Sequence, residues 1–195
     1  MSWVDHGGPE LRFCLYTLLA AVILGISTIS WAAGGTDWVL VDTQALTLTV
    51  FSAENRVLAR FHNIAIGSGG AAETHRQGDE TTPRGIFHVT WVDRHSRFNT
   101  FYGLDYPSAP IARHAYDVGT LSQAQFGAIM QALRHHRTPP QDTPLGGQIG
   151  IHGLGSGNPD VQQAVNWTNG CVALTNRDIR RLAQWMHVGT RVIIR

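Results

Sequence analysis

The sequence predicts a single domain that is predominantly β, with a few helices. Between residues 39 and 50, apolar residues alternate with polar or small ones, which is the pattern of a half-buried strand. Further apolar runs at residues 57–61, 64–66 and 86–92 are separated by turn-forming or glycine-rich stretches. Short strands with turns between them are typical of a mainly antiparallel β fold, and a last strand is expected at residues 191–194.

Length and composition suit one ordered domain with a substantial core. The chain has 195 residues, of which 43% are hydrophobic and only 15% charged, whereas disordered chains combine low hydrophobicity with high charge. A formal net charge of +1 argues against binding to nucleic acid or to an anionic membrane surface. The ten histidines are scattered, and neither H-E-x-x-H nor paired C-x-x-C spacing occurs. Neither a metal nor another cofactor is therefore expected.

The N-terminal segment, residues 1–33, is predicted to be an export signal. Residues 13–33 form an almost uninterrupted apolar run that follows Arg12 and ends in two alanines, which is the layout of a secretory signal peptide. The alternative is an uncleaved membrane anchor through residues 13–33, because the run is just long enough to span about 30 Å of hydrocarbon. The predicted folded domain comprises residues 37–195.

Two helices are expected within the domain. The first has Ser122 as its N-cap and Gln125 three residues later, which together form a capping box. The second is expected to begin with Asn176 as its N-cap and to end before Gly189. The first helix lies in a connection, residues 111–147, that is long for a compact domain, and such connections are often lids.

A histidine and a cysteine, His152 and Cys171, each lie at the end of an apolar run between residues 149 and 176. Neighbouring strand ends would allow them to meet as nucleophile and base, as in thiol acyl-transfer enzymes. The alternative is structural, because a cysteine between apolar residues is more often a small core residue. Gly170 favours catalysis, since a glycine lets the backbone approach a substrate and leaves amides free to bind an oxyanion.

The residues around this pair resemble the signature of the L,D-transpeptidase (YkuD) domain. His-Gly at residues 152–153 matches its first part, and Thr-Asn-Gly-Cys-Val at residues 168–172 matches its second. Upstream, residues 78–85 are similar to the family's G-D-x-x-T-P-x-G segment, and Tyr106 with the proline after it is similar to its Y-P. The resemblance covers nearly everything from residue 38 to the C-terminus.

The resemblance implies a β-sandwich or barrel and an exported enzyme of the periplasm or cell envelope. Its substrate would be the peptide stem of peptidoglycan, cut through a thioester on Cys171. His152 would be the base, and the backbone carbonyl of Gly153 would orient its imidazole. The acyl group would then pass to an amine, giving a cross-link or the attachment of a protein to the wall, or to water.

Four further residues become candidates for substrate binding or oxyanion stabilisation through the same resemblance. They are Thr168, Asn169, Gly170 and Tyr106.

Two positions depart from the commonest form of the motif. Many members of the family carry histidine where Asn169 stands, and arginine or asparagine where Ala173 stands. The form found here, W-T-x-G-C-x-A-L-x-N, is similar to a branch that includes a hydrolase releasing lipoprotein from the wall. A wall-linked lipoprotein is therefore a second candidate partner, and the acyl acceptor stays open between an amine and water.

Overall fold

The computed structural model describes residues 36–195, so the predicted export signal or anchor lies outside the described residues. The strands are β1 (Trp38–Asp42), β2 (Thr47–Phe51), β3 (Val57–His62), β4 (Ala71–Ala72), β5 (Thr82–Pro83), β6 (Gly85–Asp93), β7 (Phe101–Leu104), β8 (Gly150–Gly153), β9 (Val172–Leu174) and β10 (Arg191–Ile194). The helices are α1 (Ala109–Asp117), α2 (Gln123–Arg134), α3 (Pro159–Ala164) and α4 (Asn176–Leu182). None of these helices is long and apolar enough to cross a membrane.

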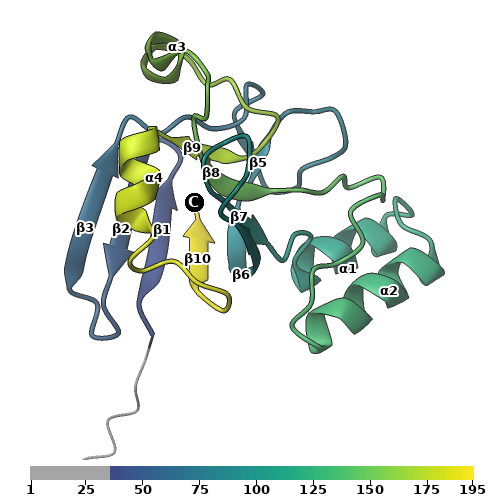
Figure 1. Ribbon diagram of the computed structural model, residues 1–195. Helices are drawn as coiled ribbons and strands as arrows, with labels where there is room; N and C mark the ends of the chain where they lie inside the picture. Colours follow the sequence, from purple (N-terminus) through teal and green to yellow (C-terminus); the bar gives the residue numbers. More distant parts are fainter. Residues whose placement is uncertain (1–35) are drawn as a thin grey trace, which may run out of the picture. The chain divides into compact units, whose positions relative to one another are not determined.

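One large sheet dominates the fold, in the strand order β3-β2-β1-β10-β6-β7-β8-β9, while β4 and β5 form a separate small ladder (Figure 1). Within the large sheet, only the β1–β10 and β8–β9 pairs are parallel. The first and last strands of the domain therefore lie side by side. The predicted, mainly antiparallel β fold with few helices is confirmed.

The two edges of this sheet are joined by the segment that follows β3. Ala65 exchanges two backbone hydrogen bonds with Ala173 of β9, at 2.9 and 2.8 Å. The sheet therefore curves until its edge strands are linked, which gives it the character of a barrel. This closure places β9, the strand directly after the cysteine, against the segment that follows β3.

The alternating pattern of β1 determines which of its side chains enter the core. Val39 and Val41 are completely buried, whereas the residues between and beside them are half-buried. Ile179 and Leu182 of α4 are also completely buried and belong to the same core, and this helix packs against β8 and β9. The strands that carry the candidate site are thus supported by a packed helix.

Several expected boundaries differ from the structure. The capping box of Ser122 at the start of α2 is present as predicted. The N-cap of α4 is Thr175 instead of Asn176, because the Thr175 hydroxyl accepts the N–H of Asp178 at 3.1 Å. The predicted strand at residues 64–66 forms only an isolated bridge.

Two helices, α1 and α3, were not expected. Both have a proline in their first turn, where the missing N–H of proline leaves no hydrogen bond unmade.

Candidate active site

Two parallel strands, β8 and β9, bring the candidate base and nucleophile together. His152 lies on β8 opposite Ala173, and Cys171 immediately precedes β9. Both side chains line one cavity of about 570 Å³. The two side chains that the sequence predicts to meet therefore share one cavity.

The imidazole of His152 is held by the residue that follows it. Its Nδ1 lies 2.7 Å from the carbonyl oxygen of Gly153, and only 2% of the residue is exposed. A carbonyl can only accept, so the proton must be on Nδ1, which leaves the Nε2 lone pair free. Gly153 has no room for a side chain, because a Cβ there would lie 2.6 Å from the Phe98 carbonyl oxygen. Glycine is therefore required after His152 because no side chain fits there, and its carbonyl accepts the hydrogen bond from the imidazole.

Aromatic rings enclose the same imidazole, and the sequence had not indicated them. The ring of Phe98 lies 4.3 Å from it, Phe101 stacks on it at 5.6 Å, and Trp167 meets it edge-on at 5.9 Å. Burial lowers the pKa of His152, the Gly153 carbonyl opposes this, and the nearby Arg97 lowers the pKa further. The imidazole is consequently neutral at pH 7 and can accept a proton.

The thiol of Cys171 is half-buried and donates to a backbone carbonyl. Its Sγ lies 3.2 Å from the oxygen of Gln148. Burial raises the pKa of the Cys171 thiol to about 12, and a backbone hydrogen bond from Gly150 only partly offsets this. Thiol and imidazole are therefore both neutral at rest, which favours proton transfer during attack over a standing ion pair.

The loop before Cys171 is braced by two threonines. The Thr168 hydroxyl donates to the Cys171 carbonyl at 2.6 Å and accepts the Gly170 N–H at 3.2 Å. The Thr82 hydroxyl donates to the Gly170 carbonyl at 2.9 Å. Gly170 itself has a φ of 124°, and a Cβ there would lie 2.7 Å from the Thr81 carbonyl oxygen. The G-D-x-x-T-P-x-G segment is thus tied directly to the loop of the nucleophile.

The other two candidates occupy different positions. Asn169 is exposed and lines the cavity beside Cys171. Tyr106 is completely buried, does not line the cavity, and donates its hydroxyl to the His75 carbonyl oxygen at 2.6 Å. In this structure Tyr106 therefore supports the loop of His75 from behind instead of facing the cavity.

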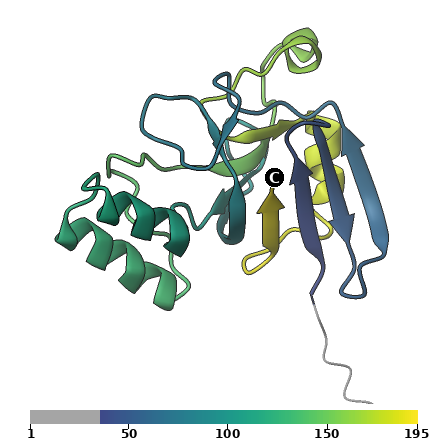
Figure 2. The same cartoon turned by 180° about the vertical axis from the view of Figure 1, so that it is seen from behind.

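The helix expected to act as a lid does not cover the cavity. Neither α1 nor α2 contributes to its walls, and both views of the fold show the two helices together at one side of the sheet (Figures 1 and 2). From the long connection, only Gln141, Gly146 and Gly147 line the cavity, together with Gln148 and Ile149 directly after it.

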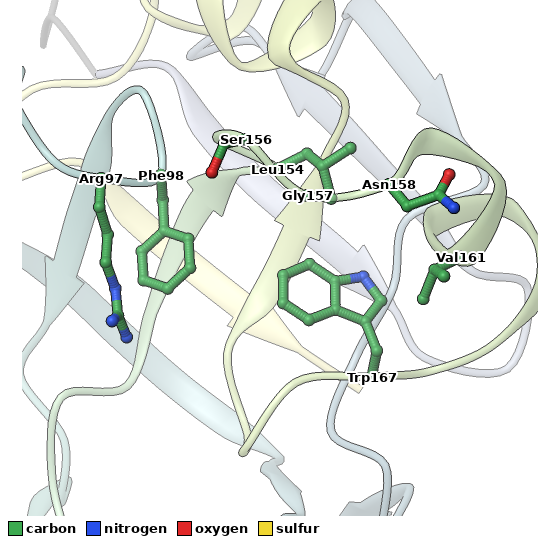
Figure 3. Close-up of a pocket in the computed structure, with 8 residues that line it drawn as sticks. All are labelled: Arg97, Phe98, Leu154, Ser156, Gly157, Asn158, Val161 and Trp167. Carbon is green, nitrogen blue, oxygen red and sulfur yellow. The ribbon is translucent and has the colours of Figure 1, made fainter.

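A smaller pocket of about 350 Å³ lies next to the cavity of Cys171 (Figure 3). Its walls come from the loop after β8 and from α3, with Leu154, Ser156 and Val161 among them. The two hollows share the side chains of three residues, Arg97, Phe98 and Trp167.

A second histidine, His75, also lines the cavity of Cys171. It belongs to the loop between β4 and β5, and its Nδ1 lies 2.8 Å from Asp79 Oδ1. Sequence reasoning missed it, although the spacing of four residues between His75 and the aspartate of the motif is a usable signal. Within residues 36–195, no three side chains of the metal-ligating types gather into a site.

The structure thus combines a curved, mainly antiparallel sheet with a cysteine and a carbonyl-bound histidine in one cavity. A model of the L,D-transpeptidase catalytic domain (YkuD) matches residues 36–194. The chain therefore belongs to this family.

The fold is similar to that of two solved structures, and no curated protein matches the sequence. Pgp2 of Campylobacter jejuni, described as a helical cell shape determining protein, is 18% identical with a TM-score of 0.54, over 82% of this chain and 47% of Pgp2. Bd1075 of Bdellovibrio bacteriovorus is 18% identical with a TM-score of 0.52, over 84% of this chain and 49% of Bd1075. This chain thus spans about half the length of either.

Proposed function

We propose that the protein is an exported cysteine L,D-transpeptidase that acts on the peptide stems of peptidoglycan through a Cys171 thioester. The observation that carries the proposal is the convergence of Cys171 and His152 in one cavity, with the imidazole fixed through Nδ1 by Gly153. The membership of the chain in the L,D-transpeptidase family supports the same substrate class.

Acylation begins with attack of the Cys171 sulfur on a carbonyl carbon of the stem. The thiol proton passes to His152 Nε2, the carbon–sulfur bond forms, and the carbonyl becomes an oxyanion. His152 then returns the proton to the departing amine as the carbon–nitrogen bond breaks. The neutral resting state of both groups makes this a proton transfer coupled to attack.

An oxyanion would be stabilised by amides of the braced loop. The N–H of Gly170 already donates to the Thr168 hydroxyl, so the N–H of Cys171 is the better donor of the two. Donors of this kind typically contribute about 3 kcal/mol to the transition state.

The second half of the reaction passes the acyl group to an amine. Hydrolysis is the alternative, and one observation favours it: α2 does not shelter the cavity from water. Water is abundant and competes for any exposed thioester. Cleavage of a stem peptide or of a wall-linked lipoprotein would then replace cross-linking or protein attachment.

The site of action that goes with this chemistry is the cell envelope. Residues 1–33 would direct export, either as a cleaved signal or as an anchor through residues 13–33. The substrate, peptidoglycan, lies outside the cytoplasmic membrane, so an enzyme of this kind must reach the periplasm.

The proposal is tested by incubating the purified protein with disaccharide peptides, with and without an added D-amino acid, and measuring the products by mass. Transpeptidation gives an amide product that requires the amine, whereas hydrolysis gives a shortened stem in either mixture. If no adduct forms on Cys171 and no stem is cut, the assignment is wrong. Adding sacculi with linked lipoprotein extends the same measurement to that partner.

A further inference from the structure

The second imidazole of the cavity, His75, is oriented as firmly as the first. Its Nδ1 lies 2.8 Å from Asp79 Oδ1 and also 2.8 Å from the carbonyl oxygen of Thr81. Both neighbours are acceptors, so Nδ1 must carry the proton. The lone pair of Nε2 is then the only hydrogen-bonding capacity left on the ring.

That lone pair has no protein partner within residues 36–195, although only 4% of His75 is exposed. The ring is flanked by two glycines: a Cβ on Gly146 would lie 3.0 Å from Nε2, and a Cβ on Gly170 would lie 3.3 Å from Cε1. Gly170 directly precedes Cys171, and the carbonyl that accepts the thiol belongs to Gln148, two residues after Gly146. His75, a buried residue whose Nε2 has no protein partner in the described part of the chain, thus lines the cavity of the nucleophile.

The carboxylate behind this ring is locked in place. Asp79 accepts the N–H groups of Arg76 at 2.7 Å and of Thr81 at 2.9 Å, and also the Thr81 hydroxyl at 2.9 Å. Burial would raise the pKa of the Asp79 carboxyl, but these hydrogen bonds outweigh it and lower the pKa below its ordinary value. Asp79 is therefore ionised at neutral pH and can stabilise a positive charge on His75.

The charges around the cavity are divided between two elements. Glu80 lines it from the same loop as His75, whereas Arg97 lines it together with Phe98, beside His152. An anionic loop is suited to an ammonium group, and a guanidinium is suited to a carboxylate. A stem peptide carries carboxylates, and an amine acceptor carries an ammonium.

We propose that His75, paired with Asp79, binds the incoming amine and accepts the proton that the amine must lose before it attacks the Cys171 thioester. This inference rests on the proposed function and names the residue that acts as base in its second half-reaction, the transfer of the acyl group to the amine. The acceptor arrives as an ammonium, gives one proton to His75 Nε2, and uses the freed lone pair to form the carbon–nitrogen bond. A second proton leaves the nitrogen through His152 to the Cys171 sulfur as the carbon–sulfur bond breaks.

The test separates the two half-reactions in a His75→Asn variant. The Asn Nδ2 can replace the Nδ1–H bond to Asp79 and Thr81, while the position of Nε2 is left empty. Acylation of Cys171, followed by mass in single turnover, should stay within about twofold of the native rate. Transfer to a D-amino acid should fall by about 10²-fold, the loss typical of a missing base, and the acyl group should go to water instead.

His88→Asn is the matched control, since His88 forms a similar pair with Asp105, at 3.2 Å, and does not line the cavity. It should change neither half-reaction. Unaltered transfer in His75→Asn overturns the inference, and so does a parallel fall of acylation, which would mean that His75 holds the stem or the fold. If native protein forms the Cys171 adduct but never uses the amine, the inference is wrong while the thioester chemistry stands. Absence of the adduct instead rejects the proposed function itself.

Discussion

The two histidines of the cavity are both hydrogen-bonded through Nδ1 to a backbone carbonyl, but only His75 also has a carboxylate beside that nitrogen. His152 donates to the neutral carbonyl of Gly153 and lies among aromatic rings. His75 faces the Asp79 carboxylate and a loop rich in hydrogen bonds. The imidazole of His152, among apolar rings, stays neutral and can accept the thiol proton. His75 instead lies beside a carboxylate, which places a negative charge next to its ring.

The difference teaches that orientation and electrostatics are set by separate parts of this site. The backbone next to His152 fixes its tautomer, while Phe98, Phe101 and Trp167 set its dielectric surroundings. For His75 the carbonyl of Thr81 accepts the hydrogen bond from Nδ1, while the Asp79 carboxylate supplies the negative charge beside the ring. Substitutions that affect one histidine and spare the other therefore test most directly whether His152 serves acylation and His75 serves transfer to the amine.

Removing the thiol should have the largest effect, because both histidines act through it. Cys171→Ala should abolish acylation and turnover while leaving the melting temperature within a few degrees of native. A carbapenem-type β-lactam should add its mass to the native protein at Cys171 and not to this variant. Residual turnover in Cys171→Ala would show that the reaction does not pass through this thiol, so neither histidine could act through it.

His152→Asn should be the next most severe change. The amide nitrogen can keep the hydrogen bond to Gly153, but no group remains to accept the thiol proton. Acylation should slow by about 10²–10⁴, the range for a lost general base. The rate of Cys171 alkylation across pH is the measurement, and an unchanged rate and pH profile would reduce His152 to a structural role.

The pH dependence of acylation should reflect the lowered pKa of His152. Since the base must be neutral, the rate should fall tenfold per pH unit only below that pKa, at an acid limb under the ordinary 6.5. The thiol adds no second inflection near neutrality, because its pKa is raised to about 12. A rate that first rises between pH 7 and 9 would indicate an imidazole that is not shielded in this way.

Gly170→Ala should disturb both histidine regions, since Gly170 lies between Cys171 and the His75 ring. A side chain at a φ of 124° costs about 1–3 kcal/mol in strain, and the 2.7 Å approach to the Thr81 carbonyl adds to it. Urea unfolding should show this loss. Gly189→Ala is the control, because its φ of 93° brings the strain but no atom lies within 4 Å of the added Cβ.

An equal loss of unfolding free energy in Gly170→Ala and Gly189→Ala would show that close packing at Gly170 contributes nothing.

The sequence was sufficient to predict the β fold and the nearness of Cys171 to His152, whereas Gly153 as a hydrogen-bond acceptor came from the family resemblance. These features depend on local patterns: alternation in the strands, and short motifs at two strand ends. Because β8 and β9 are adjacent and parallel, the histidine motif and the cysteine motif at their ends lie side by side.

The rest of the site could not be predicted, because it depends on contacts between distant segments. Phe98 and Phe101 reach His152 from the β6–β7 connection and from β7, and their rings have no motif that marks them. The expected position of α2 over the site was wrong for a related reason, since helix amphipathicity indicates burial and not the surface against which a helix packs. His75 had a signal in its spacing to Asp79, but its position on the cavity wall required the fold.

Tyr106→Phe should have the smallest effect and should separate the two histidines most cleanly. It deletes the hydroxyl that donates to the His75 carbonyl at 2.6 Å and leaves the His152 side of the cavity intact. The buried carbonyl loses its partner, so the free energy of unfolding should fall by about 1–3 kcal/mol. Because Tyr106 supports only the loop of His75, acylation should keep its native rate, while the share of acyl groups transferred to an amine should fall severalfold. If acylation and transfer fell together, Tyr106 would support the positions of both histidines and not only the loop of His75.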